Sequence, residues 1–143
     1  MGVLMNTIPQ GFAEMAPYGA FHELIGPLYR SKRGQNTVVG MHFEKKHCNA
    51  IDTLHGGMLM SLIDTALTLA AFEAAPEGQY AVTQGLSADF LSPARIGDWV
   101  EAEVEVLRAG RVAISLDCRV RKDGGEGKLL MRASGLFHVV APR

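Results

Sequence analysis

Apolar residues occupy every side of one long segment near the middle of the chain. Between residues 56 and 72, Asp64 is the only charged side chain, and the apolar positions form no single stripe. A helix that is apolar all round lies inside a protein rather than on its surface. Pro76 and Gly78 in the APEGQ segment then end the pattern. We therefore predict a buried helix from about Gly56 to Ala75.

After this helix the hydrophobic period changes to two. Apolar and polar residues alternate in DWVEAEVEVL (98–107) and in RVAISLDCRVR (111–121), which is typical of strands with one buried and one solvated face. The Ala109-Gly110 pair between them predicts a tight hairpin turn. The DGGEG segment (123–127) predicts a second turn, into a strand at about 128–140. The solvated face of the first strand is expected to carry Glu101, Glu103 and Glu105.

Three more elements complete the predicted order. Residues 81–91 supply a strand directly after the helix, and the alternation in TVVGMHF (37–43) predicts a strand before it. In FHELIGPLYR the apolar residues recur at helical spacing, so a short amphipathic helix is expected there, with Pro27 weakening its end. Residues 1–30 are interpreted as an N-terminal extension of a single domain that spans residues 1–143.

This order of elements predicts an α+β fold. A helix that is apolar on all sides needs a surface that wraps around it, and a strongly curved antiparallel sheet provides one. The expected architecture is a hotdog fold, in which a sheet of about five to six strands wraps a long central helix. A partner subunit would cover the surface of the helix that the sheet leaves open.

Composition excludes several functional classes. The 143 residues carry 14 basic and 15 acidic side chains, so bulk charge favours neither nucleic acid nor an anionic membrane as a partner. The N-terminus lacks the basic and apolar regions of a secretory signal, and the apolar segment around Asp64 is too short and interrupted to span a bilayer comfortably. Cys48 and Cys118 lie far apart, which indicates small buried thiols in a reducing compartment. A cytoplasmic location is expected.

The segment NAIDTLHGGMLMSLID (49–64) joins a glycine-rich helix start to the lone acid. A helix N-terminus presents unpaired backbone N–H groups and a positive dipole end, and glycines let a ligand approach that backbone. Gly56 and Gly57 could therefore polarise a carbonyl. Asp64 lies about 12 Å further along the axis, too far to meet Gly56 easily within one chain. A twofold dimer with antiparallel helices would bring Asp64 of one chain to Gly56 of the other.

A purely structural interpretation fits the same residues equally well. The His55-Gly56-Gly57 run could serve only to cap the helix. Asp64 would then bond locally, with a hydroxyl of its own helix, and the candidate partners are Ser61, Thr65 and Thr68. An isolated buried carboxylate is costly, so one of the two interpretations must supply Asp64 with a partner.

Asn49, His55-Gly56-Gly57 and Asp64 resemble, in order and spacing, the signature of the PaaI-like (phenylacetate-degradation thioesterase) group of hotdog acyl-CoA thioesterases. A second block, LSPARIGD (91–98), resembles the SPA(K/R)xGD segment of that group. The similarity runs from about residue 37 to residue 140. The resemblance implies a homodimer, or a dimer of dimers (a homotetramer), that hydrolyses an acyl-CoA substrate to free acid and CoA.

The resemblance also implies roles for individual residues. The Gly56 N–H would polarise the thioester carbonyl, Asn49 would position that carbonyl or the attacking water, and His55 would orient the loop. Asp64 from the facing subunit would act as general base, or as nucleophile through a mixed anhydride. The Ser or Thr that assists the acid in related members falls on Thr83. The residues expected to bind substrate are Gly57, Met58, Phe90 and Arg95.

No metal or redox cofactor is implied, since CoA belongs to the substrate. His42 and His47 lack carboxylate or cysteine partners at a metal-ligand spacing, so a structural or surface role is expected for both. Two alternative functions stay open. One is a non-catalytic acyl-CoA-binding module of the same fold, against which the retained acid argues. The other is an enoyl-CoA hydratase-like hotdog enzyme, which would usually pair an acid and a histidine in another pattern.

Overall fold

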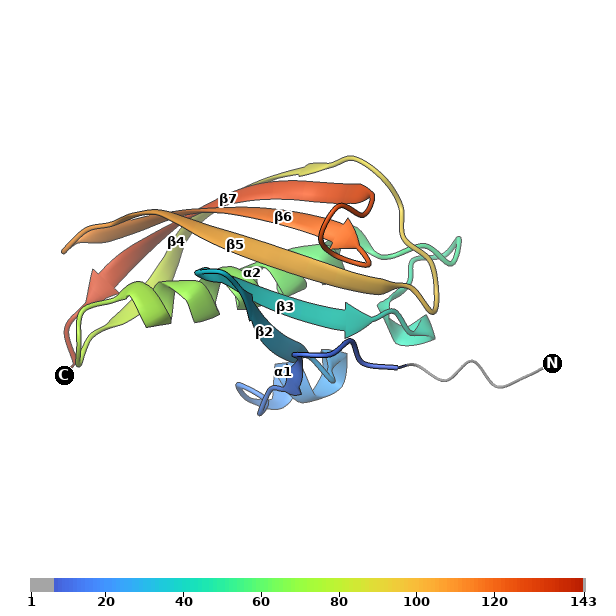
Figure 1. Cartoon of the computed structure of the whole chain (residues 1–143), viewed down its shortest axis with the longest axis horizontal. Coiled ribbons are helices and arrows are strands. Elements are labelled where there is room, and N and C mark those ends of the chain that lie inside the picture. Colours follow the sequence, from blue (N-terminus) through green and yellow to red (C-terminus); the bar gives the residue numbers. More distant parts are fainter. Residues whose placement is uncertain (1–6, 143) are drawn as a thin grey trace.

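In the computed structural model, which describes residues 7–142, a curved antiparallel sheet wraps one long helix, α2 (Gly56–Ala74) (Figure 1). The strands follow the order β1-β2-β3-β5-β6-β7-β4 across the sheet. This confirms the predicted α+β architecture. The other elements are β1 (Ala13–Glu14), α1 (Ala20–Ile25), β2 (Tyr29–Arg33), β3 (Asn36–His42), the 3-10 helix η1 (Lys45–His47), β4 (Tyr80–Phe90), β5 (Trp99–Ala109), β6 (Ala113–Lys122) and β7 (Leu129–Val140).

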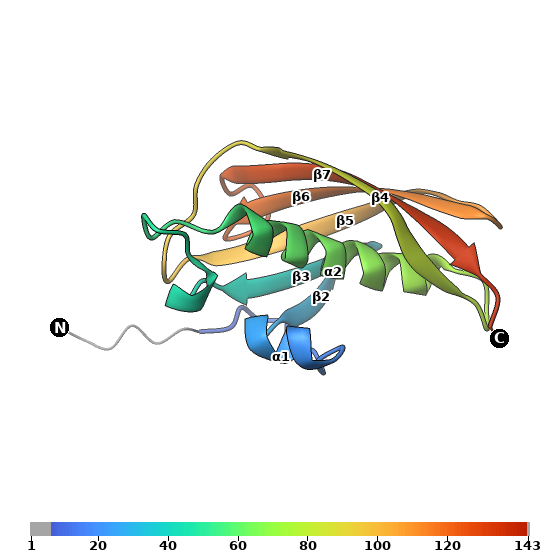
Figure 2. The same cartoon turned by 180° about the vertical axis from the view of Figure 1, so that it is seen from behind.

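Helix α2 forms the centre of the core. Ten of its 19 residues are buried, and it packs against β3, β4, β5, β6 and β7. By length and composition α2 could cross a membrane, but in this fold it lies against the concave face of the sheet (Figure 2). The sheet supplies the facing core side chains, including Met41, Leu116, Met131 and Phe137, all almost fully buried.

The sheet has seven strands instead of the five to six expected. The extra strands are β1, which has only two residues, and β2, which pairs with β3. Strand β2 has the sequence YRSKR, with three basic residues and no alternation of apolar and polar positions. A strand near the sheet edge needs no apolar face, and charged residues there discourage unwanted pairing. The hydrophobic pattern therefore gave no sign of β2.

Helix α1 lies within the segment predicted to be helical, but its apolar side chains are not buried. Phe21 is 57% exposed and Leu24 is 71% exposed, whereas Leu28, beyond the end of the helix, is in the core. Figure 2 places α1 beside the first half of α2. The N-terminal residues 1–6, on which the prediction about a secretory signal depends, lie outside the described residues.

The two cysteines differ from the prediction in one respect. Both are free thiols, and burial raises the pKa of Cys118 to about 12. Cys48, in contrast, is only half-buried, and its Sγ lies 3.4 Å from the Glu44 carbonyl oxygen. The expectation of two buried thiols is therefore right for Cys118 and wrong for Cys48.

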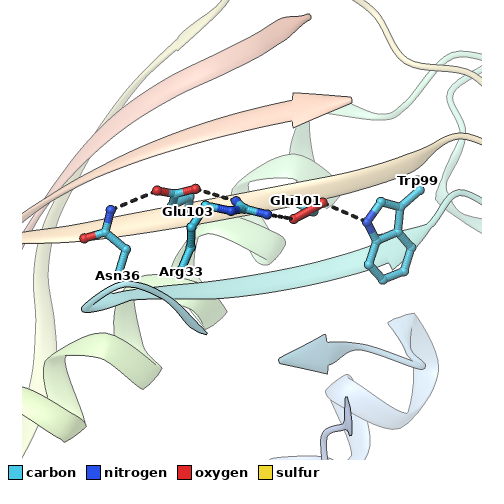
Figure 3. A network of polar contacts seen from close by, with 5 residues as sticks. All are labelled: Arg33, Asn36, Trp99, Glu101 and Glu103. Atoms are coloured by element: carbon cyan, nitrogen blue, oxygen red, sulfur yellow. Dashed lines mark hydrogen bonds and ion pairs between the residues drawn. The ribbon is translucent and has the colours of Figure 1, made fainter. Parts of the chain in front are cut away.

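The predicted alternation in β5 holds for Val100, Ala102 and Val104 on its core face, but Val106, expected on the same face, is 38% exposed. It also fails for Glu101 on the outer face. Glu101 is only 3% exposed. Its carboxylate accepts hydrogen bonds from Arg33 Nη2 at 2.9 Å and from Trp99 Nε1 at 3.1 Å (Figure 3). Gly124 lies so close to this carboxylate that a Cβ there would overlap it. The β6–β7 turn therefore covers a charge that the pattern had assigned to solvent.

The same arginine also bonds Glu103, which accepts a further hydrogen bond from Asn36 Nδ2 at 2.8 Å (Figure 3). Burial by itself would raise the pKa of Glu103, but the bonds from Asn36 and Arg33 outweigh it, and the pKa lies below its ordinary value of 4.5. The β2–β3 hairpin is thereby fixed to β5 by a charged network on the outer face of the sheet.

We expect Arg33→Met to lower the free energy of unfolding at pH 7 by about 1–2 kcal/mol, because Glu101 loses its counterion in a nearly dry site while Arg33 itself is half-exposed. The lowered pKa of Glu103 means that its contribution is full above pH 4.5 and is lost as the pH falls through the folded-state value. The difference from wild type should therefore shrink on acidification.

Urea unfolding at pH 7 and at a pH below 4 measures both effects. Arg30→Met is the matched control, since Arg30 is an exposed arginine of the same strand with no ion pair in the described chain. An equal loss of stability in the two variants at pH 7 would show that the Glu101 network adds nothing specific.

Candidate active site

The loop before α2 is organised by Asn49. Its Oδ1 accepts hydrogen bonds from the N–H groups of Ile51 and Thr53, each at 3.1 Å, and its Nδ2 donates to Thr53 Oγ1 at 2.8 Å. Asp52 within this loop adopts a left-handed conformation, with φ of 59°. An asparagine that bonds backbone groups ahead of it fixes a turn of this kind. The Asn49 amide therefore shapes the approach to the helix start.

His55 is the N-cap residue of α2. Its Nδ1 accepts a hydrogen bond from the Gly57 N–H at 2.8 Å, so the proton of a neutral imidazole lies on Nε2. The capping part of the structural interpretation is thus correct. Because Gly57 N–H is occupied, the free donor is the Gly56 N–H, which has no hydrogen-bond partner among residues 7–142.

Gly56 is kept small by a neighbouring aromatic ring. A Cβ at this position would lie 3.3 Å from Phe90 Cε1, at the end of β4. Phe90 is itself about half exposed, whereas Met58, in the first turn of α2, is buried. The Gly56 N–H, unpaired within residues 7–142, therefore lies beside a half-exposed aromatic ring, which suits a ligand with both a polar and an apolar part.

The two sequence blocks that resembled the PaaI-like pattern meet in space. Leu54 N–H donates to the Ala94 carbonyl at 2.9 Å, and Thr53 forms an antiparallel bridge with Arg95. The Arg95 N–H donates to Asp98 Oδ2 at 2.9 Å, which fixes the turn, while the Arg95 side chain is exposed. The LSPARIGD block therefore supports the loop that carries Asn49 and His55.

Asp64 lies two turns further along α2 and has a partner on the sheet. Thr83 Oγ1 of β4 donates a hydrogen bond to Asp64 Oδ1 at 3.0 Å. The hydroxyls of Ser61 and Thr65 instead donate to backbone carbonyls one turn back, so the local bonding considered for Asp64 is not found in the described residues. Asp64 is half-buried, with its second oxygen left without a side-chain donor in this part of the chain.

The predicted site residues thus form two groups within one chain. The first lies at the helix start and comprises Asn49, His55, Gly56, Gly57, Met58, Phe90 and Arg95. The second is the Asp64–Thr83 pair in the middle of α2. Eight residues of helix separate Gly56 from Asp64, about 12 Å along the axis. A single chain therefore does not bring the two groups to one reacting atom.

Sequence reasoning missed His22, a residue of α1 close to the second group. His22 Nε2 lies 3.2 Å from the hydroxyl of Thr65, the residue after Asp64. Burial lowers the pKa of His22, and the negative charge of Asp64 opposes this by raising it. One histidine in a short amphipathic segment gives no sequence signal of such a position. The described residues contain no group of three or more His, Cys, Asp or Glu side chains that could hold a metal ion.

Comparison with known proteins identifies the family. The sequence model described as "Thioesterase superfamily" matches residues 52–128. A Pseudomonas aeruginosa protein named "Putative esterase" is 36% identical over 137 residues, which cover 94% of this chain and 99% of that protein. Human acyl-coenzyme A thioesterase 13 is 34% identical over 92 residues, which cover 64% of this chain and 65% of that enzyme.

The fold comparison agrees. The structure of the Escherichia coli PaaI protein from the phenylacetic acid degradation operon superimposes with a TM-score of 0.71 at 27% identity, over 80% of each chain. The hotdog fold and the PaaI-like resemblance are thereby confirmed, and thioester hydrolysis is the activity of the family. The chain belongs to the Thioesterase superfamily.

Proposed function

We propose that this protein hydrolyses an acyl-CoA thioester to the free acid and CoA. The observation that carries the proposal is the Thr83–Asp64 hydrogen bond on one side of α2, together with the Gly56 N–H at its start, which is unpartnered in the part of the chain that the structure describes. A positioned carboxylate and a free backbone donor are the two groups that hydrolysis of a thioester needs. The name of the human relative, an acyl-coenzyme A thioesterase, supports CoA as the thiol.

The helix start supplies the electrophilic side of the reaction. The Gly56 N–H, aligned with the positive end of the α2 dipole, would donate to the thioester carbonyl and to the oxyanion that forms when water adds. Asn49 and His55 hold this donor in place, Asn49 through the loop and His55 through the cap on Gly57. Gly57, Met58, Phe90 and Arg95 would line the path of the substrate.

Asp64 supplies the nucleophilic side. Its carboxylate would take a proton from water as that water attacks the carbonyl carbon. The C–S bond then breaks, its electron pair leaves with sulfur, and the proton on Asp64 passes to that sulfur to give the CoA thiol. The hydrogen bond from Thr83 fixes one carboxylate oxygen and leaves the other free to face the water. Direct attack by Asp64 through a mixed anhydride would use the same oxygen.

The two sides would come from different subunits of a dimer. The separation of Gly56 and Asp64 along α2 supports this arrangement, because a twofold axis between antiparallel helices brings unlike ends together. The free edge of the sheet supports it as well. Among residues 7–142, strand β4 pairs only with β7, and its exposed apolar side chains include Tyr80, Val82 and Phe90. An edge strand of this kind is suited to pairing with a second copy.

Thiol release from a panel of acyl-CoA esters tests the activity itself. We expect saturable release of free CoA from at least one ester, with no added metal. Saturable binding without thiol release would favour the acyl-CoA-binding module instead. Loss of an enoyl-CoA absorbance without thiol release would favour the hydratase-like reaction.

Gly56→Pro tests the proposed donor, because proline lacks the N–H yet is tolerated at the first helical position. The preceding residue, His55, already has the extended conformation that proline requires, with φ of −64° and ψ of 132°. We expect kcat to fall about 10²–10³-fold. Gly56→Ala, which adds a side chain at the same place but keeps the N–H, is the control and should lose far less. Equal losses would mean that crowding against Phe90, rather than the donor, sets the rate.

Asp64→Asn should reduce kcat by about 10²–10⁴-fold, since an amide cannot accept the proton of water. Thr83→Val should cost roughly tenfold in kcat, because the carboxylate loses one charge-assisted hydrogen bond. Thr68→Val removes a hydroxyl one helical turn from Asp64 that makes no hydrogen bond to it within residues 7–142, and it should leave kcat within about twofold. Steady-state thiol release at saturating acyl-CoA measures all three. Full activity in Asp64→Asn would refute the proposed base.

A mixing experiment tests the two-subunit arrangement. Asp64→Ala and Gly56→Pro chains, each inactive alone, are unfolded together and refolded at equal concentration. Half of the dimers are then mixed, and one of their two sites has both groups intact, so about a quarter of wild-type activity should return. If Gly56 and Asp64 of the same chain acted together, no mixed dimer would contain an intact site and no activity would return.

A further inference from the structure

His22 links the N-terminal segment to the helix that carries Asp64. It lies on α1, and its Nε2 is 3.2 Å from Thr65 Oγ1 on α2. Its Nδ1 lies 3.3 Å from the backbone nitrogen of Tyr18, whose ring stacks on the imidazole with centroids 5.0 Å apart. Thr65 is only 4% exposed. Figure 2 shows α1 alongside this part of α2.

These contacts determine the tautomer of the imidazole. The single proton of the Thr65 hydroxyl is donated to the Ser61 carbonyl at 2.8 Å, so toward His22 the Thr65 oxygen can only accept. His22 Nε2 must therefore carry a proton. Nδ1 accepts the Tyr18 N–H and must be unprotonated. The bonds at both nitrogens are satisfied only by a neutral imidazole with its proton on Nε2.

Charged side chains of four elements lie in this region. Glu23 of α1, Glu14 of β1 and Lys46 of η1 line the same cavity of about 410 Å³ as His22. Lys46 Nζ donates a hydrogen bond to the Gly26 carbonyl at 2.6 Å. Asp64 of α2 acts on His22 through its negative charge. Burial, the larger influence, lowers the pKa of His22, and Asp64 is the charge that raises it.

We propose that His22 is a positioning residue for Asp64: its neutral imidazole, held between the Tyr18 N–H and the Thr65 hydroxyl, keeps the 15–28 segment against α2 beside the carboxylate. The inference rests on the proposed thioesterase function. Closing one flank of α2 limits the solvent around Asp64 and fixes the helix turn from which the carboxylate reaches Thr83. A base held in this way reacts faster than one free to move.

Protonation of His22 would undo both the closing of the α2 flank and the positioning of Asp64. A proton on Nδ1 would face the Tyr18 N–H and break that hydrogen bond, and the new positive charge near Asp64 would make the carboxylate a weaker base. Since the pKa of His22 lies below its ordinary value of 6.5, this change belongs to the acid side of the rate profile and is absent at neutral pH.

His22→Leu and His22→Gln form the test pair. Leucine removes the contacts at both nitrogens, so kcat for acyl-CoA hydrolysis at pH 7.5 should fall about tenfold while KM stays within about twofold. Glutamine keeps a donor for Thr65 and an acceptor for Tyr18 and should restore most of kcat. It carries no titrating group, so its kcat should decline less than that of wild type below pH 6.5.

Two further variants distinguish a role in positioning Asp64 from a purely structural role of His22. His138→Leu, an exposed histidine of β7, is the matched control and should leave kcat and its pH profile unchanged. Thr65→Val removes the acceptor, and its kcat loss should match that of His22→Leu, with no further loss in the double variant. A lower melting temperature in His22→Leu with an unchanged kcat would overturn the proposal, as would failure of glutamine to restore kcat.

A readout without turnover separates this inference from the proposed function. The imidazole ¹⁵N and ¹H shifts of His22 should show the Nε2–H tautomer at pH 7, and its pKa should fall further in Asp64→Asn, where the opposing charge is gone. If wild type releases no thiol but these shifts appear, the proposed function fails and the His22–Asp64 coupling stands. If wild type is active and the shifts are absent, the inference about His22 fails.

Discussion

Burial of α2 around most of its circumference is the constraint on which the rest of the structure depends. Each large apolar side chain that the helix removes from water contributes roughly 1.5–3 kcal/mol, and only the stripe through Gly57, Asp64 and Phe72 stays partly open. A flat sheet could cover only one face. The sheet therefore curves, with β5, β6 and β7 each running for 10 to 12 residues across the helix. Because α2 is clamped along its length, the first turn of the helix is also held rigidly.

The proposed role of the helix start depends on this fixed position. In that proposal the Gly56 N–H would need no reorganisation to meet an oxyanion, since the His55 cap, the Asn49 loop and the bridge to the LSPARIGD block all fix the same few residues. Phe90 completes the arrangement by excluding any side chain larger than glycine without displacement of its ring. Two segments that are distant in the sequence, residues 49–55 and 90–98, thus converge on one backbone group.

Asp64, in contrast, is unfavourable for stability and is retained in the position of its proposed function. A carboxylate in an otherwise apolar helix is unfavourable for folding, and its partners do not come from α2. Thr83 reaches it from β4, and the field of Asp64 extends to His22 on α1. The hydrogen bond from Thr83 uses one oxygen of the carboxylate and leaves the other available. The residue is therefore satisfied enough to be tolerated and open enough to act on water, which accords with its proposed role.

The sequence by itself determined the elements with strong periodicity and the two motif blocks. The all-round apolar run specified α2 to within one residue of its observed end, and the period of two specified β5, β6 and β7. Gly56, Gly57 and Asp64 could be singled out because a glycine-rich helix start and a lone acid are local properties of the chain. Asn49 and the role of His55 were expected only through the family resemblance. The Thr83–Asp64 contact was expected only through the family resemblance, since no local pattern links β4 to α2.

Only the tertiary structure decided features that depend on contacts between distant segments. Strand β2 has no apolar face to detect, and Glu101 follows the alternation of a solvated position yet is covered by Arg33, Trp99 and the turn at Gly124. His22 of α1 comes within 3.2 Å of Thr65 on α2 only in the folded chain. Hydrophobic periodicity records which face of one element is buried, but the partner of a polar group is set by long-range packing, which no short stretch of sequence encodes.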